Sequence, residues 1–427
     1  MSETAAPDYR QMWADLGLDL DSHDVLLEAV GGLYGATFLS QNNRPATMGY
    51  LDFVMSEVHG LRIKELDDFR KQGGKVVGTY CLYVPEEIIR AAGAWSVGIC
   101  AGAEWAYDRV EQVLPRNTCA LIKSMMGFKL GQVCPYLEEA DLLVGETTCD
   151  GKKKAYELMG ELHNMHVMEL PQMKRDKDLV FWRGEIVELM NKVEEMTGQQ
   201  VTAESLKASI KEVNDKRRAL QRIAAARAAK PSPISGKDSL LATQVAFYDD
   251  VPRFTQSMNA LADELEARIA AGEGVAPAGA KRVLITGTPM ALPNWKLHDI
   301  VESAGGIVVG EEMCTGSRYY DKLVSEDAET LDEMIDEIAA KYLDINCACF
   351  TPNTGRIDDV IRMAKELGAD GVIDYTLSFC GTYQIEAGSV EKAVKEAGIP
   401  VLRIETDYSA EDIGQLSTRV EAFLEML

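Results

Sequence analysis

Cysteine residues follow several strand-like runs of this 427-residue sequence, at points where a strand gives way to a loop. In open parallel sheets the carboxyl ends of the strands share one edge, and ligands bind in the crevice beyond it. We therefore expect the thiols of two such sheets to converge in the cleft between them, where they could bind a metal centre or carry out redox chemistry. Each half of the chain supplies three of these candidates: Cys81, Cys119, Cys149, Cys314, Cys349 and Cys380.

The other three cysteines are interpreted as packing residues. Cys100 falls within an expected strand over 96–100, and Cys134 precedes Pro135. Cys347 lies two residues before Cys349 in an expected strand over 345–350, and we interpret its side chain as pointing away from that of Cys349. The sequence leaves open whether Cys134 replaces one of the six candidates.

The spacing of the cysteines bears on the kind of metal. No C-x2-C pair of the type that binds zinc is present, and ferredoxin spacing is absent as well. Widely separated single thiolates from two domains suit an iron–sulfur cluster held between the domains. The five histidines form no ligand pattern, and no G-x-S-x-G elbow or phosphate-binding P-loop occurs. If the chemistry needs ATP, another protein must therefore hydrolyse it.

The elements that position these cysteines form an α/β pattern with two mainly parallel sheets. We expect an N-terminal helical segment at 1–70, a first α/β cluster-binding domain at 71–175, a helical connecting region at 176–280 and a second α/β cluster-binding domain at 281–427. Among the expected helices are 204–229 and 321–342. The first carries a basic run, interpreted as a solvated face, with a docking surface as the alternative: Lys207, Lys211, Lys216, Arg217, Arg218 and Arg222.

Charge and hydropathy exclude several classes of partner. Lys and Arg total 44 against 68 Asp and Glu, a formal net charge of −24 that argues against nucleic acid or an anionic membrane. No apolar run is long enough to span a bilayer. The acidic stretch 1–8 lacks the basic and apolar regions of a signal peptide. We therefore expect a cytoplasmic protein, in which thiols stay reduced.

Several motifs together resemble the 2-hydroxyacyl-CoA dehydratase and benzoyl-CoA reductase superfamily over roughly residues 70–427. The subgroup that the sequence resembles most is the double-cubane cluster proteins. The motifs are Val84-Pro85-Glu86-Glu87 after Cys81, Leu114-Pro115-Arg116-Asn117-Thr118-Cys119, Thr148-Cys149-Asp150-Gly151-Lys152, Glu169-Leu170-Pro171-Gln172, Cys314-Thr315-Gly316-Ser317-Arg318-Tyr319, Cys349-Phe350-Thr351-Pro352-Asn353 and Phe379-Cys380.

This resemblance implies a homodimer with two flavodoxin-like (Rossmann-like) domains per chain and an 8Fe-9S double-cubane cluster bound by six cysteines. By the family pattern, Cys81, Cys119 and Cys380 would be the ligands shared with single-cubane dehydratases, and Cys149, Cys314 and Cys349 the additional set. An ATP-hydrolysing reductase with its own 4Fe-4S cluster would supply electrons under anaerobic conditions. The protein would reduce small unsaturated molecules of the acetylene type.

Three residues near the expected ligands are candidates for proton supply and for tuning the cluster: Glu146, Arg318 and Tyr319. Their alternative interpretation is a surface carboxylate and a structural Arg–Tyr pair. Two other functions remain open at this point. One is a subunit of a 2-hydroxyacyl-CoA dehydratase with a single 4Fe-4S cluster. The other is a non-catalytic electron carrier or cluster-storage protein.

Overall fold

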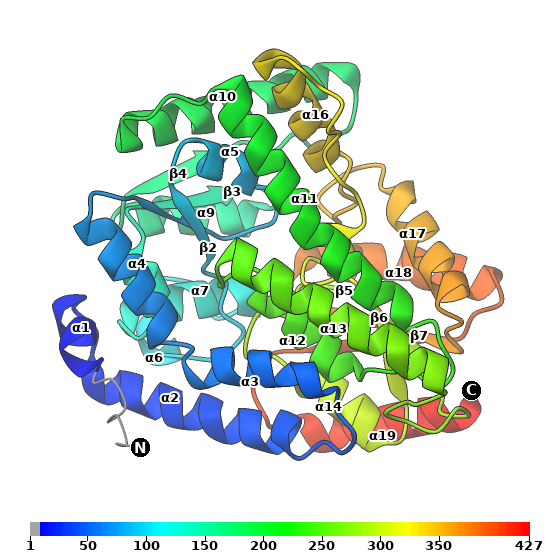
Figure 1. Ribbon diagram of the computed structural model, residues 1–427. Helices are drawn as coiled ribbons and strands as arrows, with labels where there is room; N and C mark the ends of the chain where they lie inside the picture. Colours follow the sequence, from blue (N-terminus) through cyan, green and yellow to red (C-terminus); the bar gives the residue numbers. More distant parts are fainter. Residues whose placement is uncertain (1–8) are drawn as a thin grey trace.

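Two four-stranded parallel sheets form the framework of the computed structural model, which describes residues 9–427 (Figure 1). The first sheet has the strand order β2-β1-β3-β4 and the second the order β6-β5-β7-β8. This confirms the expected α/β class with two Rossmann-like units. The strands are β1 Val76–Thr79, β2 Trp95–Gly98, β3 Leu142–Glu146, β4 Met165–Met168, β5 Arg282–Gly287, β6 Ile307–Glu312, β7 Gly371–Leu377 and β8 Val401–Thr406.

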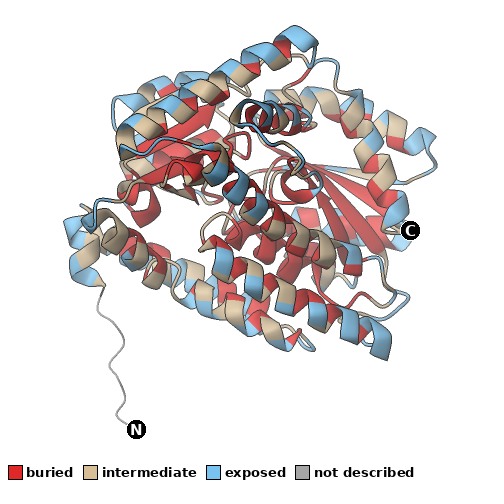
Figure 2. Ribbon diagram, turned by 45° about the horizontal axis from the view of Figure 1, so that its top comes forward, coloured by how far each residue is buried: buried red, intermediate tan, exposed pale blue. Residues whose placement is uncertain are grey.

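The central strands are apolar runs because helices cover both faces of each sheet. Every residue of β3, β5, β6 and β7 is buried, and Figure 2 shows these strands as continuous buried layers. In both sheets the first strand lies between the second and the third. The chain therefore reverses its direction of winding beside β1 and β5, and a crevice opens beyond the carboxyl ends of the strands at that point.

The N-terminal segment and the first unit contribute the first eleven helices of the described residues, of which α5, α8 and α9 contact strands of the first sheet. Cysteines stand directly before three of them, α7, α8 and α9. In chain order the helices are α1 Arg10–Asp15, α2 Leu20–Tyr34, α3 Gly49–Ser56, α4 Leu61–Lys71, α5 Glu86–Ala91, α6 Tyr107–Val110, α7 Ala120–Leu130, α8 Pro135–Glu139 and α9 Asp150–Gly160, with the short helices η1 Gly35–Leu39 and η2 Ala46–Met48 after α2.

Four helices connect the two units: α10 Asp176–Thr197, α11 Ala203–Ala226, α12 Gly236–Val245 and α13 Val251–Ala271. Figure 1 shows α11 running from α5 and α16 to the side of the second sheet, with α13 packed against it. All residues of α12 are buried, so this helix forms part of the core. The second unit adds α14 Lys296–Ser303, α15 Ser317–Tyr320, α16 Leu331–Leu343, α17 Thr354–Glu366, α18 Gly381–Glu396 and α19 Ile413–Met426.

The structure corrects three expectations about local structure. Residues 345–350 form a turn and no strand, and the helix expected over 321–342 begins only at Leu331. The basic run of α11 is not a uniformly solvated face, because Lys216 and Arg217 are buried in ion pairs with Glu86 and Glu87. Periodicity along one helix cannot reveal this, since it depends on the acidic groups that α5 brings to the helix.

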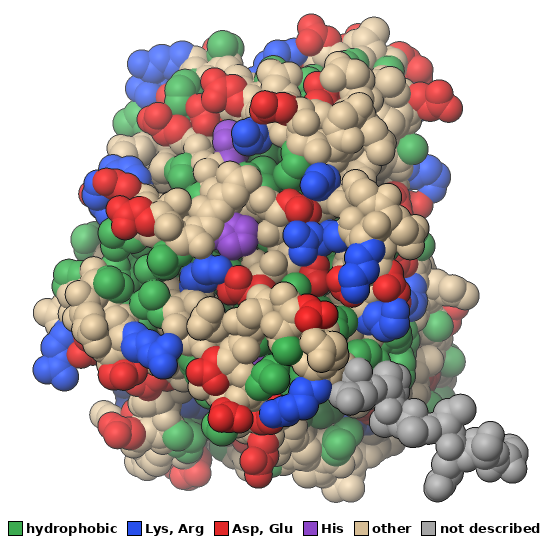
Figure 3. Space-filling view, turned by 90° about the vertical axis from the view of Figure 1, so that its left-hand side faces the viewer, with side chains coloured by type: hydrophobic (Ala, Val, Ile, Leu, Met, Phe, Trp, Pro, Cys, Tyr) green, Lys and Arg blue, Asp and Glu red, His purple; other side chains and the backbone are tan. Residues whose placement is uncertain are grey.

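The surface mixes charges of both signs. Figure 3 shows acidic and basic side chains side by side over much of one face. Within residues 9–427, no helix is both long and apolar enough to cross a membrane. The acidic stretch 1–8, from which we expect no signal peptide, lies outside the described residues. The division into four domains at residues 70, 175 and 280 stays a prediction.

Candidate functional site

Three of the predicted ligands lie at the N-terminal ends of helices. Cys119, Cys149 and Cys380 are the N-cap residues of α7, α9 and α18. The backbone N–H of Lys152 donates to Cys149 Sγ at 3.4 Å. Unpaired N–H groups and the helix dipole stabilise a thiolate at such positions.

These three thiols lie close together. The thiols of Cys119 and Cys380 interact, and this interaction is the main cause that lowers the pKa of Cys119. The charge of Cys149 also acts on Cys119, and that of Cys380 acts on Cys149. We call Cys119, Cys149 and Cys380 the N-cap group.

The remaining predicted ligands form a second group. Cys81, in the loop after β1, interacts with Cys314, in the loop after β6, and this interaction lowers the pKa of Cys314. The interaction with Cys349 likewise lowers the pKa of Cys347 to about 6. The charge of Cys347 acts on Cys314, so the two pairs are neighbours. We call Cys81, Cys314, Cys347 and Cys349 the loop group.

The structure overturns the interpretation of Cys347 as a residue that points away from Cys349. Residues two apart share a face even in a strand, and in the turn that residues 345–350 form, the two thiols interact with each other. Cys100 also differs from expectation, since it follows β2 instead of lying within it. Its Sγ donates to the Tyr80 carbonyl at 2.7 Å, and it lines a cavity together with Cys81 and Cys314. Cys134 is the N-cap residue of α8 and lines a different cavity.

Glu146, the last residue of β3, is fully buried beside the loop group. Lys152 Nζ and Thr148 Oγ1 both donate to its Oε1 atom. Its Oε2 atom has no hydrogen-bond partner among the described residues. The carboxylate charge acts on Cys81 and Cys349. A buried acceptor oxygen without a partner beside thiols can receive or pass on a proton when a ligand binds there.

Arg318 supplies a buried positive charge at the loop group. Its Nε and Nη2 atoms donate to the Glu312 carboxylate at 2.6 and 2.8 Å. The same guanidinium donates to Tyr383 Oη, which lies 3.6 Å from Cys347 Sγ. The charge of Arg318 contributes to the lowered pKa values of Cys314 and Cys347. Arg318 is therefore held where it favours negatively charged sulfur.

Tyr319 faces away from the thiols. Its hydroxyl donates to Glu86 Oε1 at 2.5 Å, and its ring packs on Phe247 with the ring centroids 4.7 Å apart. The structure thus places two of the three candidate residues, Glu146 and Arg318, beside the loop group, and directs the third into an ion cluster behind it. The catalytic roles of all three stay predictions.

Three further residues at the site escaped the sequence analysis. Lys152 is half-buried and ion-paired with Glu146, although its place in the Cys149 motif was visible in the sequence. Tyr83 is fully buried and donates to the Ile345 carbonyl at 3.2 Å, and the charges of four thiols act on it. Tyr383 lies three residues after Cys380 but contacts the other group of thiols. Nothing in the sequence signals that contact.

An iron–sulfur centre fits this donor set by its chemistry. Soft thiolates are the ligands that such clusters require. Two cations, the buried Arg318 and the half-buried Lys152, stand beside the thiols to offset the negative charge of thiolate-bound iron. Across residues 9–427, no three or more His, Cys, Asp or Glu side chains are already arranged as metal ligands. The thiols pair with one another instead, so binding of iron would replace the shared protons.

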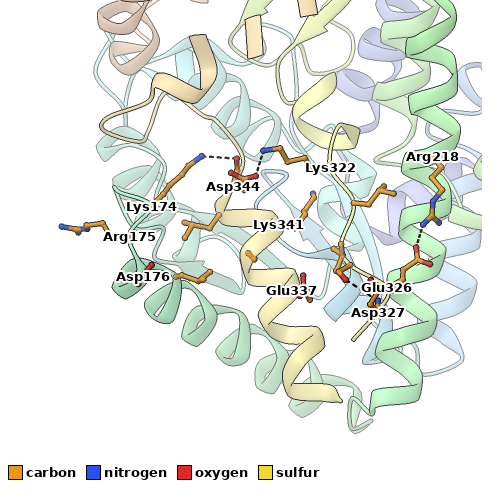
Figure 4. Close-up of a pocket in the computed structure, with 16 residues that line it drawn as sticks. Lys174, Arg175, Asp176, Arg218, Lys322, Glu326, Asp327, Glu337, Lys341 and Asp344 are labelled. Atoms are coloured by element: carbon orange, nitrogen blue, oxygen red, sulfur yellow. Dashed lines mark hydrogen bonds and ion pairs between the residues drawn. The ribbon is translucent and has the colours of Figure 1, made fainter. Parts of the chain in front are cut away.

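Two cavities lie near the site, and thiols line only the smaller one. The smaller, of about 80 Å³, lies against Cys81 and Cys314 and has mainly apolar walls. The larger is an open cleft of about 710 Å³ between α10, α11, α16 and the 322–327 loop (Figure 4). Charged residues that largely pair with one another line it, among them Arg218 with Glu326 and Lys322 with Asp344. At one end Lys174 donates to Asn346, next to the Cys347–Cys349 turn.

Comparison with known proteins gives consistent matches over most of the chain. The model of the family described as 2-hydroxyglutaryl-CoA dehydratase, D-component, matches residues 81–427, which contain all six predicted ligands. An Escherichia coli (strain K12) protein named "Putative dehydratase subunit YjiM" is 39% identical over 363 residues, covering 84% of this chain and 93% of that protein.

More distant relatives include a dehydratase and a reductase. The (R)-phenyllactyl-CoA dehydratase beta subunit of Clostridium sporogenes is 26% identical over 363 residues, covering 83% of this chain and 92% of that protein. A benzoyl-CoA reductase subunit of Thauera aromatica is 24% identical over 374 residues, covering 83% and 89%. The similarity therefore spans both α/β units in each case.

Proposed function

Because the chain belongs to the 2-hydroxyglutaryl-CoA dehydratase D-component family, within the 2-hydroxyacyl-CoA dehydratase and benzoyl-CoA reductase superfamily, we propose that it is an iron–sulfur oxidoreductase with a double-cubane 8Fe-9S cluster between its two α/β units. The observation that carries the proposal is the presence of two separate groups of thiols. The N-cap group supplies three thiols and the loop group supplies at least three. A single cubane with about three protein ligands leaves one group without a role.

The grouping also leads us to propose which thiols serve together. Cys119, Cys149 and Cys380 would hold one cubane, and Cys81, Cys314 and Cys349 the other, with Cys347 beside them. This differs from the partition that the family pattern suggests, which puts Cys81 with Cys119 and Cys380. The contacts between Cys81 and Cys314 and between Cys119 and Cys380 support the new partition.

The chain's own residues would prepare the site for reduction. The cluster, when bound, supplies electrons at low potential, one at a time, from an ATP-hydrolysing reductase that carries its own 4Fe-4S cluster. Arg318 and Lys152 offset the negative charge that accumulates at the sulfurs, and the shell of protein around them keeps water out. Glu146 Oε2, buried and without a partner among the described residues, is positioned to hold a proton for the substrate.

The size of the inner cavity supports a small substrate. About 80 Å³ beside Cys81 and Cys314 accommodates a molecule of a few heavy atoms, such as acetylene, and not a thioester of coenzyme A. We further propose a homodimer that works in the cytoplasm under anaerobic conditions, with the reductase as a transient partner. A dehydratase subunit with a single 4Fe-4S cluster is the second candidate, which the names of the relatives favour.

Iron and sulfide analysis of anaerobically purified protein tests the proposal. We expect about eight iron atoms per chain, whereas a single cubane gives about four. Cys149→Ala and Cys314→Ala remove one thiol from each group and should both lower the iron content. Cys134→Ala, outside both groups, is the control and should keep it. Unchanged iron in both the Cys149 and Cys314 variants would refute the ligand assignment.

A further inference from the structure

We propose that a chain of apolar cavities conducts small uncharged molecules from the surface beside α2 to the Cys81–Cys314 thiols. This inference rests on the proposed function, because it assigns the route by which the substrate of the same site enters. The route is built from the inner cavity described above and a second, outer cavity of about 50 Å³.

The inner cavity is apolar because its polar wall groups bond to one another. Gln244 donates through Nε2 to the Met290 carbonyl at 2.8 Å and accepts from Trp295 Nε1 at 2.7 Å. Tyr248 donates through its hydroxyl to the Cys100 carbonyl at 3.0 Å. These partners leave few polar atoms facing the cavity. Lys152 also lines the cavity, and its ammonium group is paired with Glu146. A charged molecule would lose its hydration there for little compensation, whereas an apolar molecule would lose little.

The outer cavity leads from the inner one to the protein surface. Cys100, Tyr248 and Leu292 line both cavities, so these side chains form a common partition. At its far end the outer cavity is lined by Leu27 and Val30 of α2, which are partly exposed to solvent. A change of side-chain rotamer at the partition, which takes place within nanoseconds at partly exposed positions, would open the passage.

The walls of the outer cavity carry no charge at neutral pH. Its histidine is His59, whose Nδ1 atom lies 2.9 Å from His23 Nε2. Burial lowers the pKa of His59 to about 3, with the charge of His23 adding to the effect, so the imidazole stays neutral. Burial raises the pKa of both wall thiols, Cys100 and Cys134, to about 12. An uncharged entrance followed by apolar walls selects small neutral molecules and excludes anions such as thioesters of coenzyme A.

Leu27→Trp tests the route by filling the outer cavity from the partly exposed side of α2. Leu33→Trp is the matched control, because Leu33 is 44% exposed on the same helix and lines none of these cavities. Xenon binds in dry apolar cavities and needs no catalytic cluster. We expect xenon-pressurised crystals of the wild-type protein and of Leu33→Trp to hold xenon in both cavities. Crystals of Leu27→Trp should lack it in the outer one.

Acetylene reduction with the partner reductase supplies the second measurement. Leu27→Trp should lower kcat/KM for acetylene about tenfold, which corresponds to about 1.4 kcal/mol of added barrier, and leave kcat at saturating acetylene unchanged. Leu33→Trp should leave both constants unchanged. Wild-type crystals without xenon in the inner cavity would overturn the proposal, as would equal kcat/KM values for the two variants. If the protein reduces no acetylene, the proposed function fails, and the xenon sites still decide the route.

Discussion

Glu87→Gln should destabilise the folded chain by about 3–5 kcal/mol, because it removes the carboxylate that is ion-paired with the buried charge of Arg217. Both side chains are fully buried, and Arg217 Nη1 donates to Glu87 Oε1 at 2.6 Å. Tyr342 closes a triangle with them, since its hydroxyl accepts from Arg217 at 2.9 Å and donates to Glu87 Oε2 at 2.7 Å. Glutamine keeps the size and one acceptor oxygen, so the loss comes mainly from the unpaired guanidinium.

The triangle matters to the thiol site because its three residues come from the segments that flank the thiols. Glu87 lies in α5, which follows Cys81, and Tyr342 lies in α16, which precedes the Cys347–Cys349 turn. Arg217 lies in α11, which contacts both helices. Loss of the pair should therefore loosen the loop group as well as lower global stability.

Urea unfolding followed by tryptophan fluorescence measures the effect on the apparent free energy of unfolding. A matched control is Asp263→Asn, which removes an exposed partner of Arg222 on the same α11 and should cost less than about 0.5 kcal/mol. The double variant Glu87→Gln/Arg217→Met should recover much of the loss, because no buried charge remains. A loss below about 1 kcal/mol for Glu87→Gln, or a double variant as unstable as the sum of its single changes, would refute the reasoning.

Three further predictions concern buried titratable groups. Burial, with the nearby charge of Arg217, lowers the pKa of Lys341, and its Nζ has no hydrogen-bond partner among residues 9–427. Lys341→Met should therefore raise the free energy of unfolding in urea by about 1–3 kcal/mol. A lower free energy of unfolding in this variant would contradict the prediction. Burial raises the pKa of Glu302 to about 7 from 4.5. The free energy of unfolding should thus fall by up to about 3 kcal/mol as the pH rises from 4.5 to 7. Melting curves of Glu302→Gln, measured over the same range, should lack this fall. Burial lowers the pKa of His23 to about 4 from 6.5, so its contribution to stability is full above pH 6.5 and is lost as the pH falls toward 4. In His23→Gln the melting temperature should depend less on pH over that range. The same pH dependence as in the wild-type protein would count against this prediction.

Local signals were enough to predict the elements and the class of fold. The strand-like runs at 75–80 and 282–287 became β1 and β5, because short runs rich in β-branched and other apolar residues suit a strand covered on both faces. The helical pattern of the middle region became α10 to α13. The prediction was wrong where two local structures compete, as at 345–350, since a short apolar stretch suits a strand or a turn equally well and packing decides between them.

The sequence by itself determined the parallel α/β units, the positions of cysteines in loops after strands, and membership of the family. Only the tertiary structure decided which thiols meet. Cys81 pairs with Cys314 and Cys119 with Cys380, although each pair joins two distant parts of the chain. The burial of Lys216 and Arg217 was decided in the same way, by α5. The physical reason is that strand and helix formation depends on neighbours along the chain, whereas contacts between side chains depend on how separate elements pack in three dimensions.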